Sequence, residues 1–384
     1  MIHLTQKSDC CGCGGCGQIC PQDCIEYQRD EEGFLYPHVD SSRCIQCGLC
    51  EAVCPMLKKR DQPLAEKQVF ACRNKTLETR IASSSGGVFP LLAERVIQEG
   101  GAVFGAVAEG SHIRHRCART PAEADAFRGS KYVQSEMGDC FRQAKALLEE
   151  GKKVLFSGTP CQIAGLKGFL RREYDSLLTV DCVCLGVPSP GVWEKYAAFR
   201  AQEAGAPIRT VSFRDKRTGF SDYSISLSFE NGTDYSVPHG QDPYWKGFNS
   251  LLFLRPACHS CRFKGLSRSS DITLGDYWGV ETRFPGFEDG KGVSLVITNT
   301  PAGAAAFDAI KEGTDCLSSD WEHAVSTHPS LVSSLPPSKN RKCFLERMET
   351  DPIVPLLLRQ TRPSPGALLR KAGGKILRIL KLRK

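Results

Sequence analysis

The feature that most constrains this 384-residue chain is a four-cysteine pattern that occurs twice near its start. The first copy consists of Cys10, Cys13, Cys16 and Cys20, and the second, 34 residues later, consists of Cys44, Cys47, Cys50 and Cys54. A proline, Pro21 or Pro55, follows the last cysteine of each copy. Three thiols on one short loop can bind a single metal centre together. The repeat therefore predicts a metal-binding unit rather than a disulfide framework.

The spacing within each copy, Cys-x2-Cys-x2-Cys-x3-Cys-Pro, is that of bacterial two-cluster ferredoxins, in which the fourth cysteine serves the other cluster. Soft thiolate ligands suit iron–sulfur clusters. We expect one 4Fe-4S cluster on Cys10, Cys13, Cys16 and Cys54, and another on Cys44, Cys47, Cys50 and Cys20. Paired zinc sites are the alternative, although structural zinc usually separates its cysteine pairs. Cys11 and Cys24 are expected to be extra thiols beside the clusters.

Composition limits the class of protein. The chain is 41% hydrophobic and 24% charged, which is typical of a globular protein and excludes a disordered or fibrous one. It has no apolar run of about 18–20 residues, and its first residues lack the apolar stretch of a signal peptide, so we expect a cytoplasmic protein without a transmembrane helix. The net charge of +7 comes from residues 359–384, which hold nine basic and no acidic residues; the remainder sums to 7 − 9 = −2. The body lacks a basic stripe, so nucleic acid is not an expected partner.

The order of predicted elements divides the chain into four parts. A two-cluster domain is expected over 1–60, two parts of a larger core over 68–150 and 151–328, and a Pro/Ser-rich linker with a basic tail over 329–384. The residues between the two cysteine sets should form a hairpin that turns at Glu31–Gly33. A polar linker is expected over 57–68.

Within the core, predicted helices alternate with apolar strands, which argues for a mixed α/β fold. Helices are expected over 88–98, 139–150 and 162–172, and strands over 102–108, 153–158 and 177–184. Residues 208–300 are richer in strands, with a turn at Asn231–Gly232. The predicted fold class is thus a small ferredoxin-like domain followed by a mixed α/β core, which belongs to the α+β or α/β classes.

Seven core motifs occur in a recognisable order. They are SSSGGVFPLLAERVIQEGGAVFGA, RGSKYVQS, VLFSGTPCQIAGLK, VDCVCLGVPSP, FRDK, LRPACHSCRFK and SDITLGDYWG. From about residue 5 to 315 the chain resembles the coenzyme F420 hydrogenase/dehydrogenase beta-subunit family, with a two-cluster ferredoxin module in front. The resemblance implies a flavoprotein oxidoreductase in which clusters exchange electrons with FAD. The implied hydride acceptor is coenzyme F420 or another small molecule, and a redox partner protein or ferredoxin supplies electrons. The alternative is an electron-transfer adaptor subunit without its own substrate.

The flavin candidates lie at loops and turns. A Ser/Gly-rich helix start is a natural phosphate site, or else a simple N-cap. The candidates are Ser83, Ser84 and Ser85 as hydroxyl donors, Gly86 and Gly87 for close backbone approach, Ser130 and Lys131 for a cation near the flavin, and Thr159 at a strand-to-helix turn. A solvated surface lysine is the competing interpretation of Lys131. No catalytic acid or base is assigned.

The resemblance implies a third 4Fe-4S cluster near the flavin, with Cys161, Cys184, Cys258 and Cys261 as ligands. A zinc site or buried free thiols are the alternatives. The other cysteines, expected to be core thiols, are Cys72, Cys117, Cys140, Cys182, Cys316 and Cys343. Where the family commonly has Cys-His-Gly, this chain has Leu185, and His259 is the candidate substitute. His112 and His115 are expected at the surface.

The basic end of the chain, residues 364–384, has the pattern of an amphipathic helix interrupted by two glycines. Such a helix lies on an anionic membrane surface, docks on an acidic partner, or stays solvated. The first of these options would place the protein peripherally at the inner membrane face.

Overall fold

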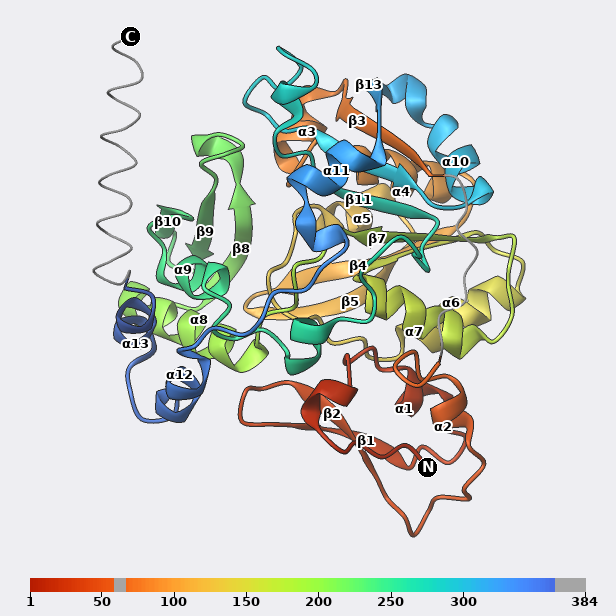
Figure 1. The fold of residues 1–384 in the computed structure, drawn as a ribbon, viewed down its shortest axis with the longest axis vertical. Coiled ribbons are helices and arrows are strands. Elements are labelled where there is room, and N and C mark those ends of the chain that lie inside the picture. Colours follow the sequence, from red (N-terminus) through yellow and green to blue (C-terminus); the bar gives the residue numbers. More distant parts are fainter. Residues whose placement is uncertain (59–66, 363–384) are drawn as a thin grey trace.

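The computed structural model describes residues 1–58 and 67–362, and Figure 1 shows three parts within them. The head, residues 1–58, lies at the bottom of the view. A large sheet with flanking helices lies above it, and a small sheet with its own helices lies to the left. The predicted linker falls largely on residues 59–66, outside the described part of the chain.

The head consists of two short helices and one hairpin. Its elements are α1 (Gly15–Ile19), β1 (Ile25–Arg29), β2 (Leu35–Val39) and α2 (Leu49–Ala52). The antiparallel pairing of β1 with β2 confirms the predicted hairpin. Each helix follows a glycine with positive φ, Gly14 (+79°) or Gly48 (+74°). Glycine adopts this conformation without the clash that a Cβ would cause, so each cysteine triplet can bend sharply into its helix.

The large sheet has the strand order β13-β3-β12-β11-β7-β6-β4-β5. Its strands are β3 (Gln68–Asn74), β4 (Ala102–Glu109), β5 (His112–Ala118), β6 (Val154–Gly158), β7 (Leu177–Cys182), β11 (Ile272–Asp276), β12 (Ser294–Thr298) and β13 (Thr314–Ser319). The four neighbours β4, β6, β7 and β11 are parallel, and the outer pairs are antiparallel. The mixed α/β fold and the three predicted strands of the core are confirmed.

Helices cover this sheet. They are α3 (Leu77–Ala82), α4 (Val88–Gln98), α5 (Pro121–Ala124), α6 (Cys140–Glu149), α7 (Pro160–Leu170), α10 (Pro301–Asp308) and α11 (Trp321–Thr327). All three predicted helices form, but α7 begins at Pro160, two residues before the predicted start. Proline is well suited to the first position of a helix, where no donor is needed. None of the helices in the described residues combines the length and apolarity needed to cross a bilayer.

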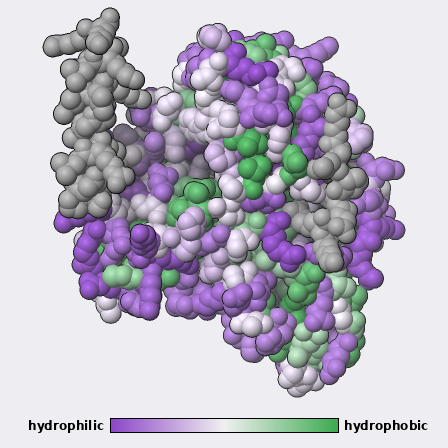
Figure 2. All heavy atoms as spheres, viewed as in Figure 1, coloured by the Kyte–Doolittle hydropathy of each residue, from purple (hydrophilic) through white to green (hydrophobic). Residues whose placement is uncertain are grey.

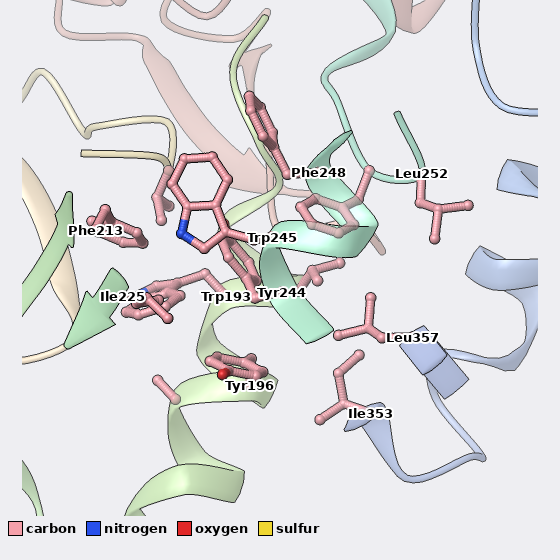
Figure 3. Packing of buried hydrophobic residues seen from close by; sticks show 14 of the residues in the cluster. Trp193, Tyr196, Phe213, Ile225, Tyr244, Trp245, Phe248, Leu252, Ile353 and Leu357 are labelled. Carbon is pink, nitrogen blue, oxygen red and sulfur yellow. The ribbon is translucent and has the colours of Figure 1, made fainter. Parts of the chain in front are cut away.

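The small sheet has the order β10-β9-β8, and its hairpin turns at the predicted Asn231–Gly232. Its strands are β8 (Ile208–Asp215), β9 (Ser224–Phe229) and β10 (Asp234–Pro238), and its helices include α8 (Pro190–Ala204) and α9 (Pro243–Asn249). A dense aromatic core joins them, in which Trp193, Tyr244 and Trp245 are almost completely buried (Figure 3).

The structure differs from the predicted tail. Residues 341–360, assigned above to a linker and tail, form α12 (Arg341–Arg347) and α13 (Ile353–Gln360). Ile353, Leu356 and Leu357 lie on one face of α13, at helical spacing, and are buried in the same aromatic core (Figure 3). The predicted amphipathic helix over 364–384 lies outside the described residues.

Candidate functional site

The first cysteine group contains Cys54 beside the first triplet. Helices α1 and α2 are in contact, which brings the fourth cysteine of the second copy next to the first copy. Burial raises the pKa of the Cys16 thiol to about 12, and the charges of Cys13, Cys10 and Cys54 contribute to the rise. The backbone N–H of Gly12 donates to the Cys10 sulfur over 3.4 Å. Four thiols and a backbone donor suit an iron–sulfur cluster.

The second cysteine group lines a small pocket and contains the cysteines of the repeat that the first group lacks. Its sulfur residues are Cys20, Cys24, Cys44, Cys47 and Cys50. Cys20 thus leaves its own triplet and lies with the second one, while Cys24 is 3.3 Å from it, sulfur to sulfur. Cys47 is exposed, as are 60% of Ile45 and 58% of Leu57. Apolar side chains gather at the surface of the head (Figure 2), so this group is open to an approaching partner.

The third cysteine group is assembled from three separate segments. Cys161 lies in the first turn of α7, Cys184 follows β7, and Cys258 and Cys261 lie in and after the 3-10 turn Pro256–Ser260. Burial raises the pKa of the Cys258 thiol, and charges on Cys184, Cys161 and Cys261 raise it further. The N–H groups of Val187 and Phe263 donate to the sulfurs of Cys258 and Cys261, each over 3.4 Å. The structure therefore brings the four predicted cysteines together.

The first and third groups are adjacent across the contact between the head and α7. Hydrogen bonds with the sulfurs of Cys13 and Cys161, together with burial, raise the pKa of the Cys11 thiol. A Cβ on Gly165 of α7 would lie 2.6 Å from the Cys13 Cβ, and one on Gly168 would lie 2.4 Å from the Val53 carbonyl oxygen. These two glycines let the head pack directly on α7. Cys11, expected only beside the head clusters, lies between two cysteine groups.

Arg255 is a buried cation at the same contact, and sequence reasoning did not single it out. Its guanidinium donates to the carbonyl oxygens of Cys10 (2.7 Å) and Leu35 (3.0 Å) and to Oε1 of Gln134 (2.8 Å). Burial alone would lower the pKa of Arg255, but the charges of Cys10, Tyr36, Cys11 and Cys258 raise it overall. A buried charge is costly without a counter-charge. Thiolate-bound clusters would supply negative charge, so the residues present fit such groups.

A cavity of about 470 Å³ lies at the carboxyl ends of the parallel strands β6, β7 and β11. Ligands bind at this edge in open α/β sheets. Seven of the eight predicted flavin residues line it: Ser83, Ser84, Ser85, Gly87, Ser130, Lys131 and Thr159. Cys184 of the third group lines the same cavity, as do the aromatic side chains of Trp245 and Phe248.

The serine–glycine loop fits a ligand only in part. Ser83 and Ser85 donate their hydroxyls to the carbonyl oxygens of Thr79 (2.7 Å) and Val293 (2.8 Å). Ser84 accepts from the N–H of Ser130 over 2.6 Å, and among the described residues no acceptor takes its own proton. Of the three predicted hydroxyl donors, Ser84 is therefore the one available to a ligand.

Gly86 is the eighth candidate, and it does not line the cavity. A Cβ on this glycine would lie 2.3 Å from the Cys72 carbonyl oxygen, and its N–H donates to Oγ of Ser294 over 2.9 Å. Glycine at this position therefore allows the loop to pack between β3 and β12. It does not serve close approach to a ligand.

Lys131 differs from a solvated surface lysine. Its ammonium donates to the carbonyl oxygens of Ala126 (2.8 Å) and Arg128 (3.0 Å), and desolvation lowers the pKa of Lys131 to about 7. Carbonyl groups carry no charge that could neutralise an ammonium. An anion in the cavity would stabilise the charged form of Lys131.

His115 was expected at the surface, and this expectation is wrong: only 2% of the residue is exposed. It shares the inward face of β5 with Ile113, a period-two signal present in the sequence. Its Nε2 lies 3.0 Å from the Ser157 carbonyl oxygen and its Nδ1 lies 2.9 Å from Oγ of Ser135. Because a carbonyl only accepts, Nε2 carries the proton and Nδ1 accepts from Ser135. Burial lowers the pKa of His115 to about 4 and keeps the ring neutral.

This histidine anchors a chain of hydrogen bonds along the cavity wall. Gln162 donates to Oγ of Ser135 over 3.1 Å and accepts the Thr159 N–H over 2.9 Å. These hydrogen bonds thus connect Thr159 through Gln162, Ser135 and His115 to Ser157, and they hold the turn between β6 and α7 in place. Thr159 also lies 3.1 Å from Cys161, hydroxyl oxygen to sulfur, so this chain of hydrogen bonds ends at the third cysteine group.

Two further expectations need correction, and a third stays a prediction. Cys182 and Cys343 are exposed rather than in the core, and Cys182 lines the cavity. His259, the candidate substitute at Leu185, bonds the Leu335 carbonyl oxygen and is not among the cavity residues. The histidines that do line the cavity are His115 and His328. No sequence motif marks His328, because it reaches the cavity from the short segment after α11.

Two family models match the chain. Residues 151–321 match the model for the C-terminal part of the coenzyme F420 hydrogenase/dehydrogenase beta subunit, and residues 9–57 match the 4Fe-4S dicluster domain. The search of curated proteins found no match. Among solved structures, the chain is similar to one from the F420-reducing NiFe hydrogenase complex of Methanosarcina barkeri, with 18% identity, a TM-score of 0.46, and coverage of 76% of this chain and 97% of that chain. The chain thus joins a segment that matches the 4Fe-4S dicluster domain to a segment that matches the C-terminal part of the coenzyme F420 hydrogenase/dehydrogenase beta subunit.

Proposed function

We propose that the protein is an iron–sulfur flavoprotein oxidoreductase that relays electrons through three 4Fe-4S clusters to FAD. Its hydride partner is coenzyme F420 or another small molecule. One observation carries the proposal: a single cavity is lined both by Cys184 of the third cysteine group and by the Ser84–Ser130–Lys131 cluster. A redox cofactor held there would lie beside a cluster ligand.

Clusters supply one-electron transfer, and the three cysteine groups would hold them. The proposed ligand sets are Cys10, Cys13, Cys16 and Cys54; Cys44, Cys47, Cys50 and Cys20; and Cys161, Cys184, Cys258 and Cys261. The position of Cys54 beside Cys16, and of Cys20 in the second pocket, supports the crossed arrangement in the head. The second group is the exposed one, the first contacts the third through Cys11, and the third reaches the cavity. This order supports a route from the surface to the cavity.

FAD supplies the conversion of single electrons into hydride. On this proposal, Ser84 and Lys131 bind its phosphates, because one offers a hydroxyl proton and the other an uncompensated positive charge. Trp245 and Phe248 form an apolar wall that excludes water. Arg214, 2% exposed in its side chain, is fixed by Asp276 at 2.6 Å and reaches the Ser84 carbonyl oxygen at 3.4 Å. It would hold the loop that carries Ser84 in a fixed position relative to Trp245 and Phe248.

The test is the cofactor content and activity of anaerobically purified protein. Bound flavin, together with reduction of coenzyme F420 or another hydride acceptor by reduced ferredoxin, would support the proposal. A brown protein that lacks flavin but passes electrons to a partner would instead support the alternative, an electron-transfer adaptor subunit. Zinc in place of iron at the third cysteine group would contradict the proposed route.

A further inference from the structure

We propose that Cys72 and Cys316 form a redox-active thiol pair, a modification site that closes to a disulfide when low-molecular-weight disulfides accumulate. Cys72 lies in β3 and Cys316 in β13, and the two residues are direct partners in the antiparallel pairing of these strands. Their sulfur atoms are 2.9 Å apart. Neither residue is a proposed cluster ligand, so the site depends on neither the flavin nor the third cluster.

The strand geometry permits the bond with little movement. Directly opposed residues of an antiparallel pair have Cβ atoms about 4.5–5.5 Å apart, and a disulfide needs about 3.5–4.5 Å. The strands must therefore approach by about 1 Å. Within the described residues, β13 is the outermost strand of the sheet and pairs with β3 only, so no second strand there holds it back.

The two thiols are differentiated in a way that suits thiol–disulfide exchange. Cys316 is half-buried and Cys72 is completely buried. A hydrogen bond from the Cys72 thiol lowers the pKa of Cys316, and the positive charge of Lys311 contributes to this. The thiolate is the attacking form of cysteine, so the accessible member of the pair is the nucleophile and the buried member is the resolving thiol.

The exchange balances in two steps. The Cys316 thiolate attacks one sulfur of the small disulfide, forms a mixed disulfide and releases one small thiolate. Cys72 loses its proton to solvent and attacks the Cys316 sulfur, and the second small thiolate leaves. The two protein thiols are oxidised, and the small disulfide is reduced to two thiols.

The bond would join the edge strand β13 to β3, which in turn contacts the strand that supports the cavity loop. On its other side Cys72 pairs with Ser294 of β12, whose hydroxyl accepts the N–H of Gly86. The cross-link would also join residues 244 positions apart in the sequence. A link across so long a loop restricts the unfolded chain strongly, so the oxidised protein should melt at a higher temperature than the reduced one.

The experiment uses the anaerobic full-length holoprotein and oxidised glutathione as the probe. Peptide mass spectrometry should find Cys72 linked to Cys316, with the pair lighter by two hydrogen atoms and restored by dithiothreitol. Cys343, an exposed thiol, is the internal control and should form a glutathione adduct. Cluster absorbance, recorded in parallel, shows whether the ligand cysteines stay bound. The Cys316→Ser variant should lose both the link and the oxidation-dependent rise in melting temperature.

Two results would overturn the proposal. In one, Cys316 accumulates as a glutathione adduct while Cys72 remains a free thiol. In the other, Cys343 reacts and neither member of the pair does. Both results are measured on the wild-type protein, so the experiment tests the proposal even if the Cys316→Ser variant folds poorly.

Discussion

Replacement of Arg255 by methionine should lower the reduction potential of the head cluster proposed on Cys10. The guanidinium is 0% exposed and lies among Cys10, Cys11 and Cys258. Methionine keeps an unbranched side chain of similar length but removes the charge and the donors. An added electron is then less stabilised, so the potential becomes more negative.

The magnitude follows from the burial of the cation. At an effective dielectric constant of about 20, a charge about 8 Å away contributes about 2 kcal/mol. For a one-electron couple, where tenfold in equilibrium constant is 59 mV, this corresponds to a shift of about −90 mV. The substitution also leaves the carbonyl oxygens of Cys10 and Leu35 without their donor, at about 1–3 kcal/mol each. The head should therefore also unfold at a lower urea concentration.

The assay is an EPR-monitored redox titration of the anaerobic protein, with Arg255→Lys as the matched control. Lysine keeps the charge, so its potential should stay close to that of the wild type even though hydrogen bonds are lost. The cysteines whose charges act most strongly on Arg255 are Cys10, Cys11 and Cys258, so the cluster proposed on Cys44, Cys47 and Cys50 should shift less. Equal shifts in the lysine and methionine variants would refute the electrostatic reasoning, as would an unchanged potential in both.

Four further predictions concern the head contact, the cavity and the cluster ligands. Burial depresses the pKa of His115 from 6.5 to about 4, so the unfolded chain binds more protons than the folded one, and the free energy of unfolding should fall by about 2 kcal/mol between pH 7 and pH 5. His115→Gln should reduce this pH dependence in urea titrations, and an unchanged pH dependence would show that other groups cause it. Gly165→Ala should destabilise the contact between the head and α7, because overpacking costs about 1–3 kcal/mol, whereas the higher helix propensity of alanine stabilises α7 by only about 1 kcal/mol. A urea midpoint at or above that of the wild type would argue against close packing of Gly165 on Cys13. Lys131→Met should weaken flavin binding about tenfold in fluorescence titrations if the ammonium meets a phosphate, whereas equal affinity would place the phosphates elsewhere. Cys54→Ser should damage the cluster of Cys10, Cys13 and Cys16, and selective loss of the other head signal in EPR would reverse the crossed assignment.

Local patterns in the sequence predicted much of the fold. The cysteine repeat and the alternation of helices with apolar strands both depend on residues that are close together in the sequence. Together with the family resemblance, these features led to the head, to three strands of the core and to seven of the residues that line the cavity. Thr159 is an example, because a turn between a buried strand and a helix is visible in the sequence alone.

Long-range packing explains what was missed. Arg255 gains its role only when the head folds back onto the core, since its acceptors include Cys10, 245 positions away. Gly86 resembles a ligand-binding glycine until β3 and β12 close around it. The residues of α13 have helical spacing, but α9, on which this helix packs, lies more than 100 residues earlier in the chain. In each case the partner that decides the role lies far away in the sequence.

The central claim, a route from the head through a third cluster to a flavin, is tested most directly by the iron and flavin content of Cys258→Ser beside the wild type. Four irons per cubane predict about twelve irons per wild-type chain with one flavin. A serine hydroxyl cannot replace the soft thiolate ligand, so the variant should hold about eight irons, retain its flavin, and no longer pass electrons from reduced ferredoxin to it. A wild-type chain with about eight irons, unchanged in iron content and flavin reduction by the substitution, would contradict the third cluster and the route through it.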